Sequence, residues 1–433
     1  MDPQRASLAA WLRAAARLAL RGHGGAEPNP CVGAVIVDGA GRLLGSGFHR
    51  RCGEAHAEVA ALADARRRGH DVRGATMLVT LEPCNSQGRT GPCSEAIVAA
   101  GIRTVVVARR DPHPKGQGGL ERLRAAGVAV HVEPEPLAMR VGEPFVHRVT
   151  RGLPWVVAKW AQTIDGRIAT RSGDSRWISS VRSRAMVHRE RGRVDAMLTG
   201  IGTVLADDPL LTARGVRVRR VARRVVVDPG LRIPSGCRLL SSLEAASVTI
   251  ACREELLGSQ TAEALRGRGV EIVGLPRLGG TGVGSPGGFA GRGAIEAAPS
   301  PARPALDLGP LLAHLAREHT VATVLVEAGP GLLGALLSQD LVNLAWVFVA
   351  PSLLGDAMAP GPVAGESPLR IAEARGFELL DARRRGSDLS LVYAPRRRTE
   401  ADSMGNPSSP QACDSAVGPM ANASTPVQSV RPR

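Results

Sequence analysis

One histidine and two cysteines in the first hundred residues constrain this chain more than any other feature. His56 stands two residues before Glu58, and Cys84 and Cys93 follow later in the sequence. One imidazole and two thiolates suit a tetrahedral Zn²⁺ and leave its fourth position open. Zinc lowers the pKa of water in such a position towards neutrality. Because Glu58 is then placed to move protons, the pattern indicates a hydrolytic zinc centre.

The local sequence around the cysteines supports this interpretation. Residues 75–80 are predicted to form a buried strand that ends just before Cys84. Gly91-Pro92 then predicts the start of a helix over Cys93–Ala100, and a helix N-terminus favours a thiolate at Cys93. Zinc nucleobase deaminases use the same residue types, although their two cysteines are separated by two residues and these are separated by eight.

A closed structural zinc site is the alternative, and it needs a fourth ligand. Cys31 and Cys52 are the nearby candidates, but a structural site gives no role to Glu58. On a regular helix the side chains of His56 and Glu58 would point about 200° apart. We therefore expect both residues at the N-terminal edge of a helix, where the backbone is not yet regular.

Length and composition set further limits. A chain of 433 residues suggests two or three domains. No apolar run reaches membrane-spanning length, and residues 7–20 predict an arginine-interrupted amphipathic helix instead of a signal peptide. Seven cysteines, two of them assigned to metal, indicate a reducing compartment. We expect a cytoplasmic protein with no membrane partner.

The net charge of +15 invites comparison with nucleic-acid-binding proteins. The charge is spread along the chain, however, and aromatic residues, which stack on bases, make up only 3%. Lys115 and Lys159 are the two lysines among the 55 basic residues, so the excess of arginine indicates a compositional bias. We expect no nucleic-acid partner, and a nucleic-acid-editing deaminase is the alternative.

Alternating helical and strand patterns predict an α/β protein of two domains. The first covers residues 1–147, and Glu133-Pro134-Glu135-Pro136 begins the exit from it. The second covers 148–395, with a Gly/Pro-rich insertion at 279–305, and 396–433 is predicted to be a disordered tail. The strands predicted in the second domain are Trp155–Ala161, Ala196–Leu198, Val225–Val227, Val248–Ala251, Val270–Val273, Val324–Val326 and Trp346–Ala350.

Two glycine-rich turns follow strands of the second domain. Residues 325–331 run from a strand into a glycine turn and a helix, and Gly200-Ile201-Gly202-Thr203 follows another strand. Glycines at such places let a phosphate approach backbone N–H groups, and ligands collect at the carboxyl ends of strands in α/β sheets. The alternative is that both are ordinary turns, because strand–glycine–helix sequences are common.

Lys159 is a lysine inside an apolar strand of an arginine-rich chain. Lysine loses its proton when buried, and it donates a proton to a carbonyl or imine, which arginine does not do. We therefore predict a catalytic role. The alternative is an edge-strand lysine in water or a simple phosphate contact.

The chain closely resembles the bifunctional riboflavin-biosynthesis protein family, in which a pyrimidine deaminase is fused to a pyrimidine reductase. The resemblance extends to about Arg396. It rests on nine motifs: Pro28–Gly33, Gly47–His49, Gly53–Glu58, Thr80–Cys84, Gly88–Cys93, Asp165–Ala169, Ser172–Ile178, Gly202–Pro209 and Glu327–Pro330.

The resemblance implies two folds and two consecutive reactions. It implies an N-terminal cytidine-deaminase-like three-layer α/β/α domain and a C-terminal dihydrofolate-reductase-like α/β domain. Zinc-dependent deamination of 2,5-diamino-6-(5-phosphoribosylamino)pyrimidin-4-one would come first. NADPH would then reduce the ribosyl chain, giving 5-amino-6-(5-phosphoribitylamino)uracil. The partner is thus a phosphorylated pyrimidine, and we expect a homo-oligomer.

The resemblance also assigns site residues. His56, Cys84 and Cys93 match the zinc ligands, and Glu58 matches the proton shuttle. The positions that match contacts to the deaminase substrate are Asn29, His49, Arg89 and Asp111. The positions that match NADP contacts are Ala161, Trp177, Thr203, Asp207, Gly329, Pro330, Gly331, Leu332, Leu333, Gly334 and Ala335. The positions that match contacts to the reductase substrate are Ser175, Arg191, Leu211, Arg214 and Glu327.

Two positions depart from the family pattern. Asn85-Ser86-Gln87 stands where the family commonly has a histidine or two, and Gly91 stands where a proline is usual. The first change leaves a third interpretation open, a reductase with a degenerate deaminase lobe.

Overall fold

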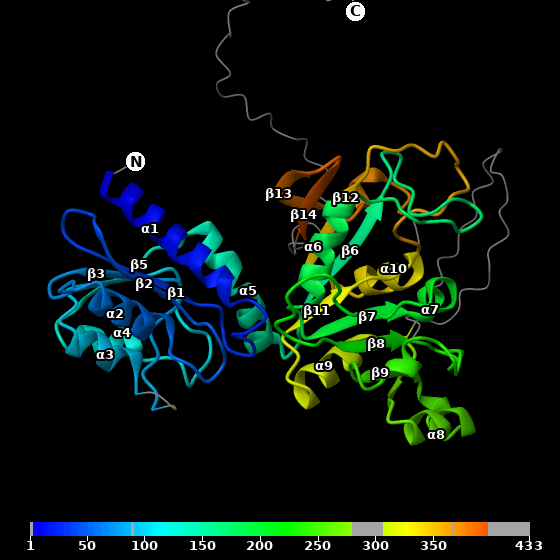
Figure 1. Ribbon diagram of the computed structural model, residues 1–433, viewed down its shortest axis with the longest axis horizontal. Helices are drawn as coiled ribbons and strands as arrows, with labels where there is room; N and C mark the ends of the chain where they lie inside the picture. Colours follow the sequence, from blue (N-terminus) through cyan, green and yellow to red (C-terminus); the bar gives the residue numbers. More distant parts are fainter. Residues whose placement is uncertain (1–2, 88–90, 279–305, 366–367, 397–433) are drawn as a thin grey trace, which may run out of the picture. The chain divides into compact units, whose positions relative to one another are not determined.

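The computed structural model describes residues 3–87, 91–278, 306–365 and 368–396. The predicted insertion at 279–305, the predicted tail from residue 397 on, and Arg89 lie outside the described residues. Two β-sheets organise the described part of the chain (Figure 1). No helix within these ranges is long and apolar enough to cross a membrane.

The first sheet has the strand order β2-β1-β3-β4-β5. Strand β1 pairs antiparallel with β2 and β3, whereas β3, β4 and β5 run parallel. The predicted buried strand before Cys84 is therefore confirmed. The bounds are β1 (Gly33–Val37), β2 (Leu43–Phe48), β3 (Thr76–Val79), β4 (Thr104–Val107) and β5 (Ala129–Val132).

Helices cover both faces of this sheet, which makes three layers. One core joins α1 and α5 to Val35, Leu78 and Val106. The other core joins α2, α3 and α4 to the opposite face, with Ile36 and Met77 at its centre. Alternating side chains of the strands thus feed two cores. The bounds are α1 (Pro3–Ala19), α2 (Ala57–Arg67), α3 (Cys93–Ala99), α4 (Gly119–Ala125) and α5 (Pro136–Arg151).

Helix α5 begins where the sequence predicted only an exit from the domain. Pro136 occupies its first turn, and the Glu135 side chain accepts a hydrogen bond of 2.8 Å from the Ala138 backbone N–H. Ala138 is buried against α1. The helix runs through residue 147, the predicted domain boundary, and ends at Gly152 in the left-handed conformation.

Glycines hold helix α2 close to strand β2. A Cβ atom on Gly47 would lie 2.4 Å from the Ala61 backbone nitrogen and 2.5 Å from the Ala57 carbonyl oxygen. A Cβ on Gly45 would lie 2.4 Å from the Ala61 oxygen. Any side chain at these positions would push the helix off the sheet. Helix α2 carries His56 at its N-cap, so this packing positions the predicted zinc site.

The second sheet has the order β10-β9-β8-β7-β11-β6-β12-β14-β13. The first seven strands in this order, from β10 through β12, run parallel to one another. Strand β14 pairs antiparallel with β12, and β13 pairs antiparallel with β14. The seven parallel strands are those predicted. The bounds are β6 (Trp155–Gln162), β7 (Ala196–Gly200), β8 (Arg223–Val227), β9 (Val248–Arg253), β10 (Glu271–Leu275), β11 (Thr323–Val326), β12 (Leu344–Val349), β13 (Phe377–Arg385) and β14 (Asp388–Pro395).

Two cores lie on opposite faces of this sheet. One buries α9 and α10 against Val156, Ala158 and Val324, and the other buries α7 and α8 against Met197 and Ile250. The bounds are α6 (Val181–Arg191), α7 (Ile201–Asp207), α8 (Gln260–Gly267), α9 (Gly309–Glu318) and α10 (Pro330–Ser338), with 3₁₀ turns at Leu20–Gly22, Leu240–Ser242, Glu254–Leu256 and Ile371–Glu373.

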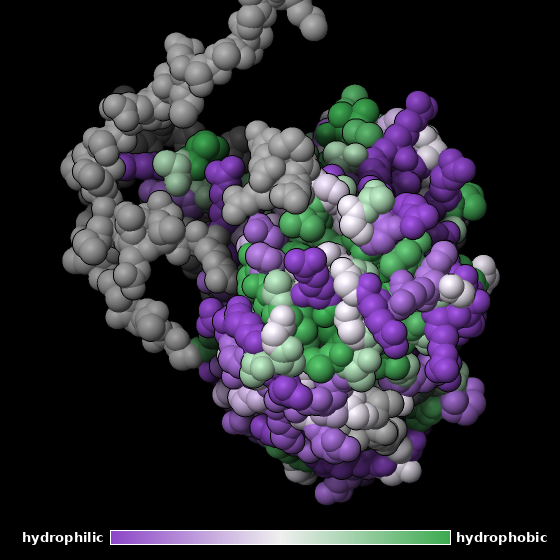
Figure 2. Space-filling view, turned by 90° about the vertical axis from the view of Figure 1, so that its left-hand side faces the viewer, coloured by the Kyte–Doolittle hydropathy of each residue, from purple (hydrophilic) through white to green (hydrophobic). Residues whose placement is uncertain are grey.

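The face of the molecule in Figure 2 has a hydrophobic area with hydrophilic side chains around it.

Substitution of Gly47 by alanine tests the packing of α2. The added Cβ collides with helix backbone, so we expect a loss of about 1–3 kcal/mol in stability and a lower zinc content of the purified protein. Gly39→Ala is the matched control, because nothing lies within 4 Å of a Cβ at Gly39. Thermal melting and metal analysis measure both effects. A Gly47→Ala protein with unchanged zinc content and melting temperature would contradict this account.

Candidate functional site

Three predicted metal ligands converge at one point. The Nδ1 of His56 lies 3.2 Å from the Cys93 Sγ and 3.5 Å from the Cys84 Sγ, and all three ligand atoms lie within 4.8 Å of one another. Tetrahedral Zn²⁺ with ordinary Zn–N and Zn–S bonds places nitrogen and sulfur about 3.6 Å apart. The donor atoms and their spacing therefore fit a zinc ion with three protein ligands.

Each ligand is positioned by the end of a secondary-structure element. His56 is the N-cap of α2 and has extended backbone angles, as predicted. The direction of its side chain is therefore not set by the angular spacing of residues along the helix. Cys84 follows β3, and Cys93 is the first residue of α3. The Cys93 thiol donates a hydrogen bond to Cys84, which together with His56 lowers the pKa of Cys84. A thiolate is the form that a metal needs.

Glu58 lies beside the ligands without joining them. Its carboxyl group is buried and interacts with Cys93, so it faces the site. Burial raises its pKa to about 7, because the charged carboxylate loses its hydration. A carboxyl group that titrates near neutrality both takes up and releases protons at physiological pH.

No fourth protein ligand completes the cluster among the described residues. The Sγ of Cys31 lies 3.7 Å from a Glu27 carboxylate oxygen, and Cys52 is an exposed free cysteine. Both candidates for a closed structural site are thus outside the cluster. Three ligands and an open position are typical of catalytic zinc.

Two of the predicted substrate contacts lie next to the ligands. The His49 ring packs edge-on against that of His56, with the centroids 5.3 Å apart. His49 Nδ1 lies 3.1 Å from the Ala55 carbonyl, and its Nε2 lies 3.3 Å from the Asn29 Nδ2. If Nδ1 carries the proton, Nε2 accepts from Asn29, and the asparagine Oδ1 stays free to meet a ligand.

Asp111 lies at the carboxyl end of β4, and a buried glutamate holds it there. The Glu82 carboxylate accepts hydrogen bonds from the backbone N–H groups of Asp111 (3.1 Å) and Leu120 (3.2 Å). Burial raises the pKa of Asp111. Glu82 was not among the predicted site residues, although it lies in the motif Thr80–Cys84.

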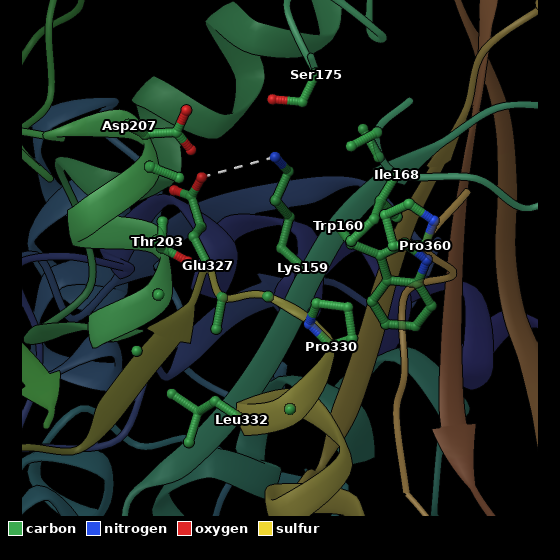
Figure 3. Close-up of a pocket in the computed structure, with 18 of the residues that line it drawn as sticks. Lys159, Trp160, Ile168, Ser175, Thr203, Asp207, Glu327, Pro330, Leu332 and Pro360 are labelled. Carbon is green, nitrogen blue, oxygen red and sulfur yellow. Dashed lines mark ion pairs between the residues drawn. The ribbon is translucent and has the colours of Figure 1, made fainter. Parts of the chain in front are cut away.

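A second site is a cavity of about 930 Å³ at the carboxyl ends of the parallel strands of the larger sheet. Figure 3 shows Lys159 and Glu327 pointing toward one another across it. The predicted residues that line it are Lys159, Ala161, Ser175, Trp177, Arg191, Thr203, Asp207, Arg214, Glu327, Gly329, Pro330, Gly331, Leu332 and Ala335.

A buried charge cluster lies at the centre of the cavity. Arg191 makes two hydrogen bonds to the Glu327 carboxylate, of 2.6 and 2.9 Å, and Lys159 Nζ lies 3.6 Å from it. Burial favours the protonated acid, but the charges of Arg191 and Lys159 prevail and lower the pKa of Glu327 to about 2. Burial lowers the pKa of Lys159, and the Glu327 carboxylate opposes that shift.

Both glycine turns line the cavity. Gly329 is the N-cap of α10, and a Cβ placed on it would lie 4.0 Å from the Thr203 Oγ1 of α7. The N-termini of the two helices are thus neighbours, with Gly202 and Gly331 leaving open space. Adjacent helix N-termini with exposed backbone N–H groups fit the phosphates of a dinucleotide.

Three predicted contact residues lie elsewhere. Leu333 and Gly334 face the protein interior on the buried side of α10, and a Cβ on Gly334 would lie 1.7 Å from the Ala364 carbonyl oxygen. Leu211 is buried in the core around α7 and α8. A run of sequence carries no information on which side of a helix faces a ligand, so the turn prediction included the inward-facing residues.

Several lining residues were missed. His188 and Arg232 bring an imidazole and a guanidinium group to the cavity lining, and Leu306 and Leu308 form part of its apolar wall. Arg232 follows strand β8 and so stood at the carboxyl end of a predicted strand, which was an available signal.

Comparison with known proteins agrees with both sites. A family model described as the RibD C-terminal domain matches residues 154–391, which is more than half of the chain. A second model, the cytidine and deoxycytidylate deaminase zinc-binding region, matches residues 6–109. The chain belongs to the RibD family.

Individual relatives match over almost their whole length. The riboflavin biosynthesis protein RibD of Aquifex aeolicus is 35% identical over 385 residues, which cover 88% of this chain and 97% of that protein. The protein of the same name from Mycobacterium tuberculosis H37Rv is 42% identical over 375 residues, covering 85% and 92%.

Solved structures give the same result. Acinetobacter baumannii RibD is 32% identical, with a TM-score of 0.71 and coverage of 91% of this chain and 100% of that one. A Thermotoga maritima deaminase/reductase is 29% identical with a TM-score of 0.72 and the same coverage. The predicted family, both predicted folds and the prediction of a zinc-dependent deaminase and NADPH-dependent reductase of riboflavin biosynthesis are confirmed.

Serine substitutions at two cysteines test the ligand set. Cys84→Ser removes one of three metal donors, so we expect zinc affinity to fall by at least about 100-fold. Cys52→Ser is the matched control, because Cys52 is exposed and outside the cluster. Zinc per chain after dialysis against a chelator measures both. Equal zinc loss from the two variants would mean that Cys52 is a ligand and that the site is closed.

Proposed function

We propose that this RibD protein deaminates 2,5-diamino-6-(5-phosphoribosylamino)pyrimidin-4-one at the His56 site and reduces the ribosyl chain of the product in the Lys159 cavity. The observation that carries the proposal is the convergence of His56, Cys84 and Cys93 on one point beside the buried Glu58. A zinc ion held by only three protein ligands leaves room for water and substrate.

In the deaminase site the residues divide the work by chemistry. Bound zinc would supply a water of low pKa for attack on the amino-bearing carbon. Glu58 is the residue that would take up a proton and deliver it to the departing amine, because its raised pKa suits both transfers. Asn29 and His49 orient the pyrimidine, and Asp111 is held by Glu82 for a further contact.

In the reductase site bound NADPH would supply the hydride, and we assign Lys159 the role of proton donor. The Lys159 ammonium group is held beside the Glu327 carboxylate, which favours the protonated form that a proton donor needs. The Arg191 guanidinium donates hydrogen bonds to the Glu327 carboxylate and to the Thr212 carbonyl oxygen. We assign it the positioning of Glu327, and Arg214 is left to bind the substrate phosphate.

A homo-oligomeric state, a cytoplasmic location and the domain limits stay predictions from the sequence. So do the contacts of Arg89 with substrate and of Ala161, Trp177, Ser175 and Asp207 with cofactor or substrate. The cavity supports the last four, because all of them line it.

Ammonia release and NADPH oxidation test the proposal directly. The wild type should release ammonia from the diaminopyrimidine phosphate and then oxidise NADPH. Glu58→Gln should lower ammonia release by about 10²–10⁴-fold, and NADPH oxidation should return when deaminated intermediate is added.

A wild type that oxidises NADPH only with added intermediate would show a degenerate deaminase lobe. Salt-sensitive binding of RNA with ammonia release from it would instead support the nucleic-acid-editing alternative.

The pH profile of NADPH oxidation tests the role of Lys159. Lys159 loses its proton as the pH rises through its lowered pKa. Turnover of the deaminated intermediate should therefore fall on the alkaline side, at a pH below the usual pKa of a lysine. Glu327→Gln removes the charge that opposes the shift, so the alkaline limb should move to lower pH. Lys159→Arg, which cannot deprotonate, should lose at least about 100-fold in kcat. Full turnover of Lys159→Arg would exclude the proton-donor role.

A further inference from the structure

Four arginines line the reductase cavity, and one of them stands apart. Arg191 pairs with Glu327, and Arg184 bonds the Ser179 carbonyl and stacks on Trp177. Arg214 lies beside Arg191 and is assigned above to the substrate phosphate. Arg232 lies on the loop after β8, and its guanidinium forms no hydrogen bond or ion pair with any residue that the structure describes.

The loop that carries Arg232 is rigidly built. The buried Asp228 carboxylate accepts hydrogen bonds from the backbone N–H groups of Ile233 (2.8 Å) and Gly230 (3.4 Å). Leu231 and Ile233 are anchored in the core, and Leu231 adopts the left-handed conformation with φ 50°. Arg232 lies between these anchors and is itself exposed. Arg232 is thus a cation on the cavity wall that no hydrogen bond or ion pair ties to the described residues, although its charge interacts with the buried Asp228 carboxylate of the same loop.

The sheet order fixes where along a bound cofactor Arg232 lies. Strands β6, β11, β7 and β8 are successive neighbours, and their carboxyl ends share one edge. Lys159 belongs to β6, the glycine turns follow β11 and β7, and Arg232 follows β8. Three strand spacings, about 14 Å, separate the two ends. With the reacting nicotinamide near Lys159 and the phosphates at the glycine turns, the adenosine reaches β8.

The cavity around Arg232 suits an adenosine. Val227, Pro229, Leu306 and Leu308 line this end, and they offer apolar surface to a flat base. An arginine fork matches the geometry of a phosphate and makes charge-assisted hydrogen bonds to it. NADPH carries a phosphate on its adenosine ribose, whereas NADH carries a hydroxyl there.

We propose that Arg232 binds the 2′-phosphate of NADPH and is the residue that selects NADPH over NADH. The proposal rests on the reductase function proposed above. It goes beyond it by assigning cofactor selectivity to one side chain that the sequence analysis did not identify.

Nucleotide binding to the whole protein tests the proposal without turnover. Adenosine 2′,5′-bisphosphate and adenosine 5′-monophosphate are titrated calorimetrically into wild type, Arg232→Gln, Arg232→Lys and the control Arg317→Gln. Arg317 is an exposed residue of α9 that does not line the cavity. Arg232→Gln should weaken the bisphosphate by about 10- to 100-fold and leave the monophosphate unchanged. Arg232→Lys should lose less, because it keeps the charge.

Kinetics with deaminated intermediate should agree. In Arg232→Gln the kcat/KM for NADPH should fall by a similar factor, with little change for NADH. Unchanged bisphosphate affinity, equal loss of both nucleotides, or wild type that binds neither would overturn the proposal. Wild type that prefers the bisphosphate through Arg232 but oxidises no NADPH would keep this proposal and refute the reductase function instead.

Discussion

Parallel pairing of neighbouring strands is the constraint on which both halves of this protein depend. In the larger sheet β11 lies between β6 and β7, with Val326 opposite both Ala158 and Leu198. This register brings Glu327 to Lys159, although the two residues are far apart in the sequence. The charge cluster, the glycine turns and the cavity all follow from carboxyl ends that share one edge.

The smaller sheet uses the same arrangement for a different purpose. Strands β3 and β4 are parallel, so Cys84 and Asp111, which follow them, lie at one edge. Helix α2 also contributes to this site, because glycines on β2 allow the helix to lie close to the sheet. His56 therefore reaches the cysteines from a helix N-cap, and Glu58 is buried in the first turn of the same helix. One sheet edge carries the proposed zinc site, and the other carries the proposed dinucleotide site.

The sequence predicted most of the fold because strand patterns and glycine turns are local signals. The seven parallel strands of the second domain and the position of His56 at a helix edge were predicted from such signals. Helix α5 was missed because Pro134 and Pro136 indicate an exit when read alone, whereas Pro136 begins a helix that Glu135 caps. Strands β13 and β14 were missed because they lie at the exposed edge of the sheet and mix charged with apolar residues.

The site was predictable where chemistry restricts the residue type. Few side chains bind zinc, so His56, Cys84 and Cys93 stood out. Arginines are so common here that the position of Arg232 after a predicted strand was too weak a signal to single it out, and only the structure places it in the cavity. Leu211 is the opposite case. The family resemblance suggested a contact with the reductase substrate at this position, whereas the structure places the residue in the core.

A crystal structure of the full chain grown with zinc and NADPH, with diffraction recorded at the zinc absorption edge, tests the account most directly. We expect one anomalous peak per chain, bonded to His56 Nδ1 and the sulfurs of Cys84 and Cys93, with Glu58 beside it and unbound. We also expect NADPH along the carboxyl edge of the larger sheet, with its nicotinamide near Lys159. A zinc ion with Cys31 or Cys52 as a fourth ligand, or a cofactor bound away from that edge, would contradict this account.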